Sequence, residues 1–239
     1  MTAAFPQVTC LSVIYINSTD RVQDLEKGLL TTLENIIFAD VHLVVIKDCA
    51  QYDKICKILD DQKLDFEVGP NYGKWDYWQE EVYSCRTPFL LEVDFDVQAE
   101  PRHLRNLLRA MTCLNILTNG KGCMCAYSCS PGRDLELFAG SILFRRSEFV
   151  MYDINKAIPG YFRLSCVSVA KQIPRVPLRC GYGTDPIYAL ALEKTGLSGC
   201  WVSDPDPMMN IIQHQARPTQ AKSRVGDNIR KFEMLWGNR

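Results

Sequence analysis

The sequence is poor in histidine, with three His in 239 residues, and it contains no internal repeat and no low-complexity tract. It also lacks an excess of either charge, because 27 Lys and Arg stand against 28 Asp and Glu. This balance gives no electrostatic case for non-specific nucleic-acid binding. The basic residues are unevenly spread, however: residues 217–239 carry six of them against two acidic residues.

Long apolar runs are absent as well. Residues 1–8 lack the basic start and the apolar stretch of a secretory signal, and the apolar run 8–16 is too short to span a bilayer. The chain has eleven cysteines, an odd number spread along its whole length. Free thiols in a reducing compartment are the simplest interpretation, so we expect a cytoplasmic protein with no transmembrane segment.

Three of the cysteines, Cys123, Cys125 and Cys129, are close together in the sequence. Zinc sites usually show paired Cys-x-x-Cys knuckles with a second pair elsewhere, and this spacing is different. The first two lie in an apolar stretch, which predicts a buried strand and not a metal cluster.

The first half of the chain alternates strands and helices. Apolar, β-branched runs predict strands over residues 8–16, 41–46, 66–68 and 89–93. Apolar residues at helical spacing predict helices over residues 22–33, 52–59 and 75–82. This order predicts an α/β fold with a mostly parallel, Rossmann-like sheet flanked by helices. Ligands of such sheets bind beyond the carboxyl ends of the strands.

The second half is more mixed. Pro101 opens an amphipathic helix, and strands are predicted over residues 124–127 and 141–144. Another helix starts at Asp185-Pro186 and ends near Gly196. A last helical pattern over residues 229–236 follows a polar segment over residues 213–227.

Asp94 and Asp96 carry the strongest chemical signal. They flank one residue directly after the fourth predicted strand, so both carboxylates can project toward a common point. Carboxylate oxygens are hard ligands suited to Mn²⁺ or Mg²⁺. A divalent ion at this place would stabilise the negative charge of a departing diphosphate. An isolated Asp-x-Asp is common in solvated loops, and the position after a strand–helix series gives this one its weight.

Several segments together resemble a known family. They are residues 89–96 (Phe-Leu-Leu-Glu-Val-Asp-Phe-Asp), the helix 74–86 before them, and residues 138–146, 183–186 and 231–237. In order and spacing they resemble the GT-A-fold glycosyltransferases, closest to the family 2 type, over nearly the whole chain. The resemblance implies one GT-A domain over residues 1–239. Its parts would be a nucleotide-binding half (1–98), an acceptor-binding half (99–212) and a flexible basic lid with a C-terminal helix (213–239).

The resemblance also implies substrates and roles. The donor would be a nucleoside diphosphate sugar, UDP- or GDP-linked, and the acceptor a hydroxyl of a glycan or similar molecule. Asp94 and Asp96 match the carboxylates that hold the nucleotide and the metal, with Asp96 the more direct ligand. Asp48 matches the residue that contacts the base, and Asn17 and Asp20 match a nucleotide-facing loop. That loop departs from the usual family pattern.

Asp185 matches the general base of inverting members, although Thr184-Asp185-Pro186 stands where the family often has two acidic residues. A helix N-terminus stabilises a carboxylate by about 0.3–1 kcal/mol, which opposes the raised pKa that suits a base, whereas burial favours it. The alternative is that Asp185 only caps the helix. The two roles are compatible.

The remaining candidates each have a structural alternative. His214 matches a late histidine that binds the metal in many GT-A enzymes, or is a surface residue, whereas His42 and His103 are expected to be structural. Lys74 is placed to reach the nucleotide. Three further basic residues form either a lid that closes over the diphosphate or an ordinary solvated loop: Arg217, Lys222 and Arg224.

Two other functions are compatible with an α/β fold. A nucleotidyltransferase that makes sugar nucleotides needs a glycine-rich loop after the first strand, and residues 17–21 contain no glycine. A non-catalytic nucleotide- or glycan-binding domain would be supported by loss of the carboxylates, and both are present.

Overall fold

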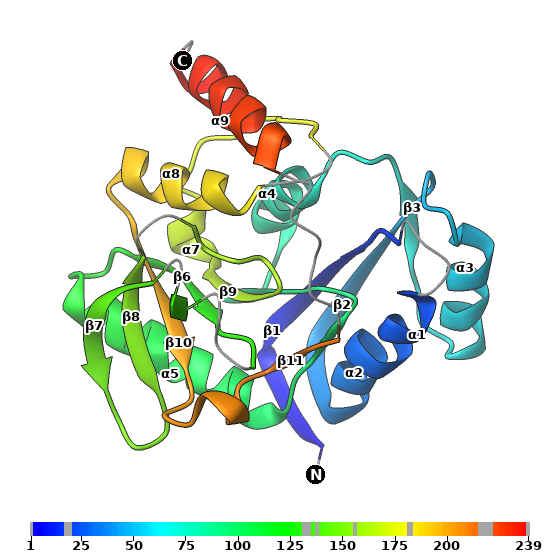
Figure 1. Ribbon diagram of the computed structural model, residues 1–239, viewed down its shortest axis with the longest axis horizontal. Coiled ribbons are helices and arrows are strands. Elements are labelled where there is room, and N and C mark those ends of the chain that lie inside the picture. Colours follow the sequence, from blue (N-terminus) through cyan, green and yellow to red (C-terminus); the bar gives the residue numbers. More distant parts are fainter. Residues whose placement is uncertain are drawn as a thin grey trace.

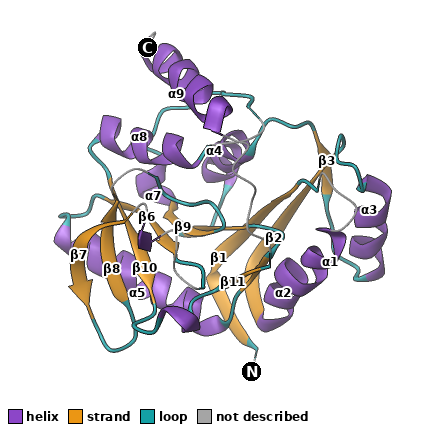
Figure 2. Ribbon diagram, in the orientation of Figure 1, coloured by secondary structure: helices purple, strands orange, loops and turns teal. Residues whose placement is uncertain are grey.

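A computed structural model describes residues 2–16, 21–130, 135–136, 139–154, 157–180, 184–214 and 222–237. A nine-stranded sheet in the order β3-β2-β1-β4-β9-β6-β10-β8-β7 forms the centre, and helices cover both of its faces (Figures 1 and 2). The predicted α/β class is confirmed.

The N-terminal half contains the predicted strand–helix alternation. Its strands are β1 (Ala3–Ile14), β2 (Ile36–Ile46), β3 (Glu67–Gly69) and β4 (Phe89–Val93). Its helices are α1 (Val22–Leu25), the π-helical η2 (Glu26–Leu30), α2 (Thr31–Asn35), α3 (Tyr52–Asp61) and α4 (Lys74–Ser84). Strands β1 and β2 begin earlier than the apolar runs indicated, because their first residues pair with each other, Ala3 opposite Ile36.

The second half contains more strands than the sequence pattern indicated. Its elements are β5 (Val97–Gln98), α5 (Pro101–Leu117), β6 (Gly122–Tyr127), β7 (Ala139–Arg145), β8 (Val150–Ile154), β9 (Phe162–Cys166), α7 (Val167–Ala170), α8 (Asp185–Thr195), β10 (Ser198–Ser203), η3 (Pro207–Met209), β11 (Ile212–Gln213) and α9 (Lys222–Gly237). The pattern predicted α5, β6, β7, α8 and part of α9, and it missed β8, β9 and β10.

The sheet is mostly parallel, as predicted. Strands β3, β2, β1 and β4 are parallel neighbours, and β6 and β10 form another parallel pair. Only β9, between β4 and β6, and β8, between β10 and β7, run in the opposite direction. The carboxyl ends of β1 to β4 therefore share one edge, where α/β proteins bind their ligands.

Each face of the sheet carries its own hydrophobic core. Helices α1 to α3 and α5 pack on one face, and α4, α7, α8 and α9 pack on the other. Strand β4 shows the alternation that this requires, because Leu91 and Val93 belong to the first core and Leu90 to the second. Every residue of β6 is buried and all eleven cysteines are free thiols, so the strand interpretation of Cys123 and Cys125 is confirmed.

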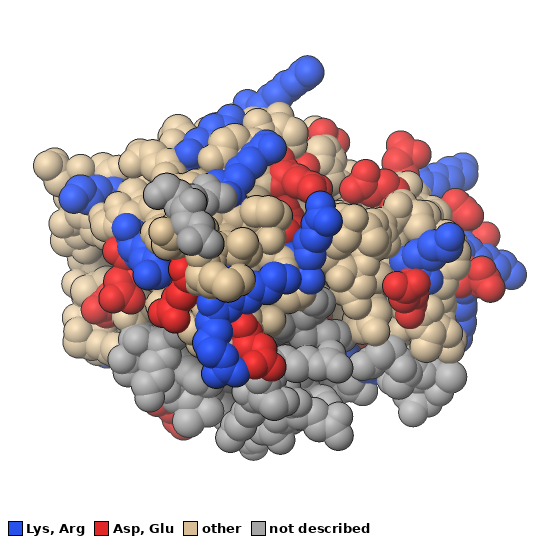
Figure 3. Space-filling model, turned by 90° about the horizontal axis from the view of Figure 1, so that it is seen from above, with Lys and Arg blue, Asp and Glu red and all other residues tan. Residues whose placement is uncertain are grey.

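The C-terminal region differs from the sequence-based expectation. Helix α9 begins at Lys222, within the segment predicted to be polar loop, so Lys222 and Arg224 lie in the first turns of a helix. Their side chains, and Arg217 entirely, lie outside the described residues. Seen from above, side chains of both charges are interspersed over the molecule, in keeping with the balanced composition (Figure 3). No described helix is both long and apolar enough to cross a bilayer.

Candidate active site

Asp94 and Asp96 lie at the carboxyl edge of the sheet, directly after β4. Their exposed fractions are 2% and 0%. The amide of Asp94 donates to the carbonyl of Tyr161 (2.9 Å), and the amide of Val97 donates back to the carbonyl of Asp94 (3.1 Å). The two aspartates thus occupy a tight, buried turn, and the solvated-loop alternative is wrong for this pair.

The π-helical segment η2, which follows β1, packs directly against this turn. A Cβ on Gly28 would lie 2.6 Å from the backbone of Asp96 and from the carbonyl oxygen of Phe95, so only glycine permits the contact. The next amide, of Leu29, donates to that carbonyl (3.1 Å). Gly28 lies in the π-helical turn η2, and π-turns are often found at functional sites. The close packing fixes the backbone that carries both carboxylates.

Two cations neutralise the aspartates. A guanidinium nitrogen of Arg21 lies 2.8 Å from Oδ2 of Asp96, and the ammonium of Lys74 pairs with Asp94. Oδ1 of Asp96 is buried and has no hydrogen-bond partner among the described residues. An unsatisfied buried acceptor is costly, and a hard cation would satisfy it, so the donor set fits Mn²⁺ or Mg²⁺.

The predicted histidine lies beside this turn. Strand β11 pairs with β5, and the amide of His214 donates to the carbonyl of Asp96 (2.9 Å). Its Nε2 forms a hydrogen bond with the side chain of Gln98 (3.1 Å). The side-chain nitrogen Nε2 of Gln213 donates to Oδ2 of Asp96 (3.4 Å). Within the described ranges, no group of three or more His, Cys, Asp and Glu side chains is arranged to hold a metal ion. The fold therefore brings His214 to the aspartates with its ring turned to Gln98.

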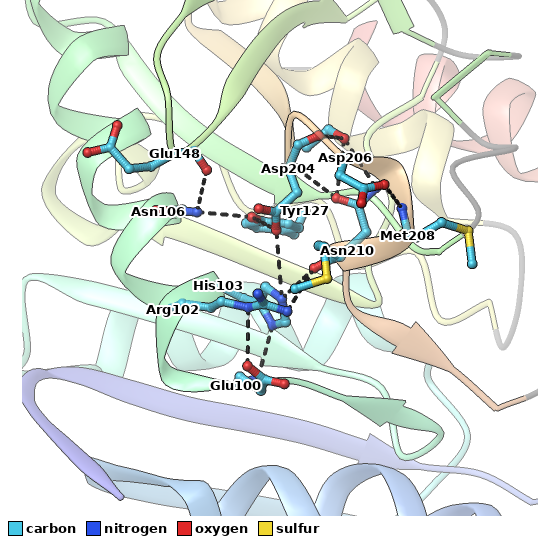
Figure 4. A network of polar contacts seen from close by, with 12 residues as sticks. Glu100, Arg102, His103, Asn106, Tyr127, Glu148, Asp204, Asp206, Met208 and Asn210 are labelled. Atoms are coloured by element: carbon cyan, nitrogen blue, oxygen red, sulfur yellow. Dashed lines mark hydrogen bonds and ion pairs between the residues drawn. The ribbon is translucent and has the colours of Figure 1, made fainter. Parts of the chain in front are cut away.

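A buried polar network holds the loop that leads to His214 (Figure 4). The hydroxyl of Tyr127 donates to Asp204 (2.9 Å), and the side chain of Asn210 accepts from the amide of Asp204 (2.7 Å). Nε2 of His103 lies 3.0 Å from the carbonyl of Met209. Burial lowers the pKa of His103 to about 4, so the ring is neutral near pH 7 and donates to that carbonyl. The structural role expected for His103 fits these contacts.

Asp185 is the first residue of α8, and its Oδ1 accepts from the amide of Gly160 (3.2 Å). The helix N-cap is Thr184, and no side-chain capping hydrogen bond is made there among the described residues. Asp185 is thus the first helical residue and not the N-cap, and its role as general base stays a prediction. Gly160 precedes Tyr161, whose carbonyl binds the amide of Asp94, so the two acidic sites lie on either side of one short segment.

A buried ion pair lies beneath these residues. The guanidinium of Arg163, with an exposed fraction of 0%, donates through Nε to Glu92 (2.8 Å) and lies 3.2 Å from the centroid of the Tyr188 ring. The Tyr188 hydroxyl donates to the other Glu92 oxygen (3.2 Å). Burial raises the pKa of Glu92, and the charge of Arg163 opposes that rise. Sequence reasoning missed this network, although a glutamate inside the apolar run of β4 was a signal for it.

The other predicted residues are placed as follows. Asp48 is exposed just after β2, and the nearby amide of Ala50 donates to the carbonyl of Ile16 (3.0 Å), so its loop lies beside the end of β1. Asn17 and Asp20 lie outside the described residues. Sequence reasoning also missed Arg21, which a search for a basic residue after the first strand would have found.

Known proteins share this architecture at very low sequence identity. No protein-family model and no curated protein matches the sequence. Among solved structures, a mannosyltransferase from Pyrobaculum calidifontis, in complex with GDP-Man and Mn²⁺, is 12% identical with a TM-score of 0.53. The match covers 98% of this chain and 65% of the mannosyltransferase, so the chain spans about two thirds of that protein.

Two further solved structures have the same architecture. Glucosyl-3-phosphoglycerate synthase from Mycobacterium tuberculosis, solved with Mg²⁺ and UDP, is 12% identical with a TM-score of 0.58, and the match covers 95% of this chain and 79% of that one. A CMP:2-keto-3-deoxy-manno-octonic acid synthetase, solved with CTP, is 11% identical with a TM-score of 0.50, and the match covers 82% of this chain and 89% of the synthetase. The stronger likeness is to the two glycosyltransferases, and together with the strand order it shows that this chain has the GT-A fold.

Proposed function

We propose that this chain is a metal-dependent glycosyltransferase that moves a sugar from a UDP- or GDP-sugar to a hydroxyl of a glycan or similar acceptor, with inversion. The observation that carries the proposal is the pair of buried aspartates at the carboxyl edge of β4, one of whose oxygens has no partner among the described residues. The glycosyltransferase neighbours, one solved with GDP-Man and Mn²⁺ and the other with UDP and Mg²⁺, support it.

Asp94, Asp96 and His214 are the residues that would hold Mn²⁺ or Mg²⁺. The ion would supply positive charge to the departing diphosphate. Arg21 and Lys74 neutralise the aspartates in its absence, and both can turn to the diphosphate when a metal takes the carboxylates.

Asp185 is the proposed general base. It would take the proton of the acceptor hydroxyl, which then attacks the anomeric carbon from the side opposite the diphosphate, so the configuration inverts. Its carboxylate accepts one hydrogen bond, from the Gly160 amide, and lies near the charge of Arg163, which leaves acceptor sites on its oxygens for that proton.

The halves of the chain take separate roles in this proposal. Residues 1–98 bind the nucleotide, with Asn17, Asp20 and Asp48 at its base and ribose. Residues 99–212 bind the acceptor. Residues 213–239 form a lid and a C-terminal helix whose basic residues contact the diphosphate: Arg217, Lys222 and Arg224.

The alternative is a nucleotidyltransferase, which the synthetase neighbour supports. The absence of glycine from residues 17–21 argues against it, because a triphosphate is usually cradled by the amides of a glycine-rich loop. Assays for the two reactions differ in their product. A glycosyltransferase releases UDP or GDP from the sugar nucleotide, whereas the alternative releases pyrophosphate from a nucleoside triphosphate and a sugar phosphate.

The decisive variant is Asp96→Asn, with Asp61→Asn as its control because Asp61 is exposed at the end of α3. In a thermal-shift panel with Mn²⁺, the correct nucleotide at 100 times its Kd should stabilise the wild type and the control by about 2.7 kcal/mol. We expect Asp96→Asn to lose this stabilisation and to lose sugar transfer by at least about 100-fold. Transfer by Asp96→Asn at the wild-type rate would show that the metal assignment is wrong.

A further inference from the structure

The segment 158–161 links the two acidic parts of the candidate site. The carbonyl of Tyr161 accepts from the amide of Asp94 (2.9 Å), and the amide of Gly160 donates to Oδ1 of Asp185 (3.2 Å). Because Gly160 and Tyr161 are consecutive, a two-residue stretch of backbone connects the start of α8 to the turn after β4. A shift of this stretch would move Asp185 relative to Asp94.

A side chain at Gly160 would crowd the carboxylate of Asp185. A Cβ at this position would lie 3.2 Å from Oδ1 of Asp185, and 3.5 and 3.6 Å from two guanidinium nitrogens of Arg163. Gly160 also lines a narrow crevice together with Lys74 and Asp94. A Cβ at this position would therefore push the Asp185 carboxylate away by a few tenths of an ångström.

Arg163 anchors the other end of the segment. One of its terminal nitrogens donates to the carbonyl of Ile158 (3.1 Å), while Nε donates to Glu92 and the plane of the guanidinium stacks on Tyr188. Glu92 lies two residues before Asp94 on β4, and Tyr188 lies one turn after Asp185 on α8. A single fully buried side chain thus contacts the strand, the helix and the segment between them.

We propose that Gly160 and Arg163 are positioning residues that fix the distance between Asp185 and the two aspartates after β4. The inference rests on the function proposed above, because it gives Asp185 and the aspartates their separate roles in one reaction. A misplacement of about 1 Å between reacting groups can lower a rate by about 100-fold. Changes at these two positions should therefore lower kcat and leave the KM for the sugar nucleotide and the affinity for Mn²⁺ unchanged.

The first test compares Gly160→Ala with Gly237→Ala. A Cβ on Gly237, the last residue of α9, meets no atom within 4 Å, so this control adds the same methyl group in open space. We expect Gly160→Ala to reduce kcat by about 10- to 100-fold with donor KM within about twofold of the wild type. Equal kcat values for the two variants would overturn the role of Gly160, and so would a loss confined to donor KM.

The second test is Arg163→Lys, which keeps the charge beside Glu92 and removes the planar fork that reaches Ile158. We expect a lower melting temperature, because the fork and the stacking are lost, and in the folded protein a loss of kcat with unchanged donor KM. A wild-type kcat in a folded Arg163→Lys protein would overturn the role of Arg163.

A measurement without substrate separates this inference from the proposed function. Amide hydrogen exchange at Gly160 and Asp94 should be faster by on the order of tenfold in Arg163→Lys than in the wild type, with exchange in β1 and β2 unchanged. If the wild type transfers no sugar, the proposed function fails, and the exchange data still decide whether Arg163 holds the segment. Unchanged exchange at both amides would overturn the anchoring.

Discussion

At the scale of single residues, the site balances charges that the fold removes from water. Asp96 is fully buried, and the side chain of its partner Arg21 is 12% exposed, so the pair is screened little by solvent. The guanidinium also lies over the Phe95 ring, 4.9 Å from its centroid. Arg21 thus holds the turn together, and under the proposed function it would compete with the metal for Asp96.

Arg21→Met should destabilise the metal-free protein by about 2–4 kcal/mol, because it leaves the Asp96 carboxylate buried without its partner. Mn²⁺ should then raise the melting temperature of this variant more than that of the wild type. Arg86→Met, at an exposed position, is the matched control and should behave like the wild type. An equal response to Mn²⁺ in all three proteins would contradict a metal at Asp96.

At the scale of elements, hydrogen bonds hold the loop between β10 and β11 against its neighbours. Its fixed points are the Asp204–Tyr127 and His103–Met209 hydrogen bonds, which attach it to β6 and α5 (Figure 4). The loop delivers β11 to β5, and this pairing puts His214 beside Asp96. Damage to the network should therefore weaken the site at a distance.

The pKa of His103, lowered by burial to about 4, predicts a pH dependence of stability. Between about pH 4 and 6.5 the unfolded chain binds a proton at His103 that the folded chain does not. The contribution of neutral His103 to the free energy of unfolding is therefore fully present above about pH 6.5 and is lost as the pH falls toward 4. The loss of unfolding free energy from pH 7.5 to 4.5 should be smaller in His103→Gln by about 2–3 kcal/mol. Denaturant titrations at the two pH values measure this difference.

The pKa of His42 is shifted in the opposite direction to that of His103. Its pKa is raised because hydrogen bonds to Glu81 (2.5 Å) and Asp40 (2.9 Å) outweigh the burial that lowers it. Its contribution to stability is present below about pH 6.5 and is lost as the pH rises through the raised pKa. His42→Gln should therefore destabilise the protein more at low pH. If the two variants changed the pH dependence of stability in the same direction, one of the two assignments would be wrong.

At the scale of the whole molecule, the end of the chain closes the second core. Phe232 of α9 is fully buried, and its ring stands nearly perpendicular to that of Trp75, with centroids 5.7 Å apart. Trp75 in turn lies against Trp78 and Tyr188, so α9 contacts a cluster shared by α4 and α8. These two helices carry Lys74 and Asp185, and the last helix therefore supports both.

Phe232→Ala should lower the free energy of unfolding by about 3–5 kcal/mol, because it leaves a cavity in this cluster. Met234→Ala is the control, since Met234 is 61% exposed, and it should change stability by less than about 0.5 kcal/mol. Denaturant unfolding of the two variants measures the difference. A Phe232→Ala protein within about 1 kcal/mol of the wild type would show that α9 is not docked as described.

The sequence by itself determined the local and periodic features. The buried runs of β1, β2 and β4 and the apolar spacing of α3, α4 and α5 mark their own elements, because period and burial are encoded in neighbouring residues. The position of Asp94 and Asp96 followed from the same reasoning, since a carboxylate directly after a buried strand must lie at the edge of the sheet.

Only the tertiary structure decided how distant residues combine. Strand β9 lies between β4 and β6, and nothing in its own few residues specifies a partner on either side. The same holds for Arg163, which could not be paired with Glu92 until those strands were neighbours, and for Gly28, whose role depends on the backbone that packs against it. Such contacts form only when the sheet assembles, because pairing and close packing between segments far apart in the chain depend on both partners.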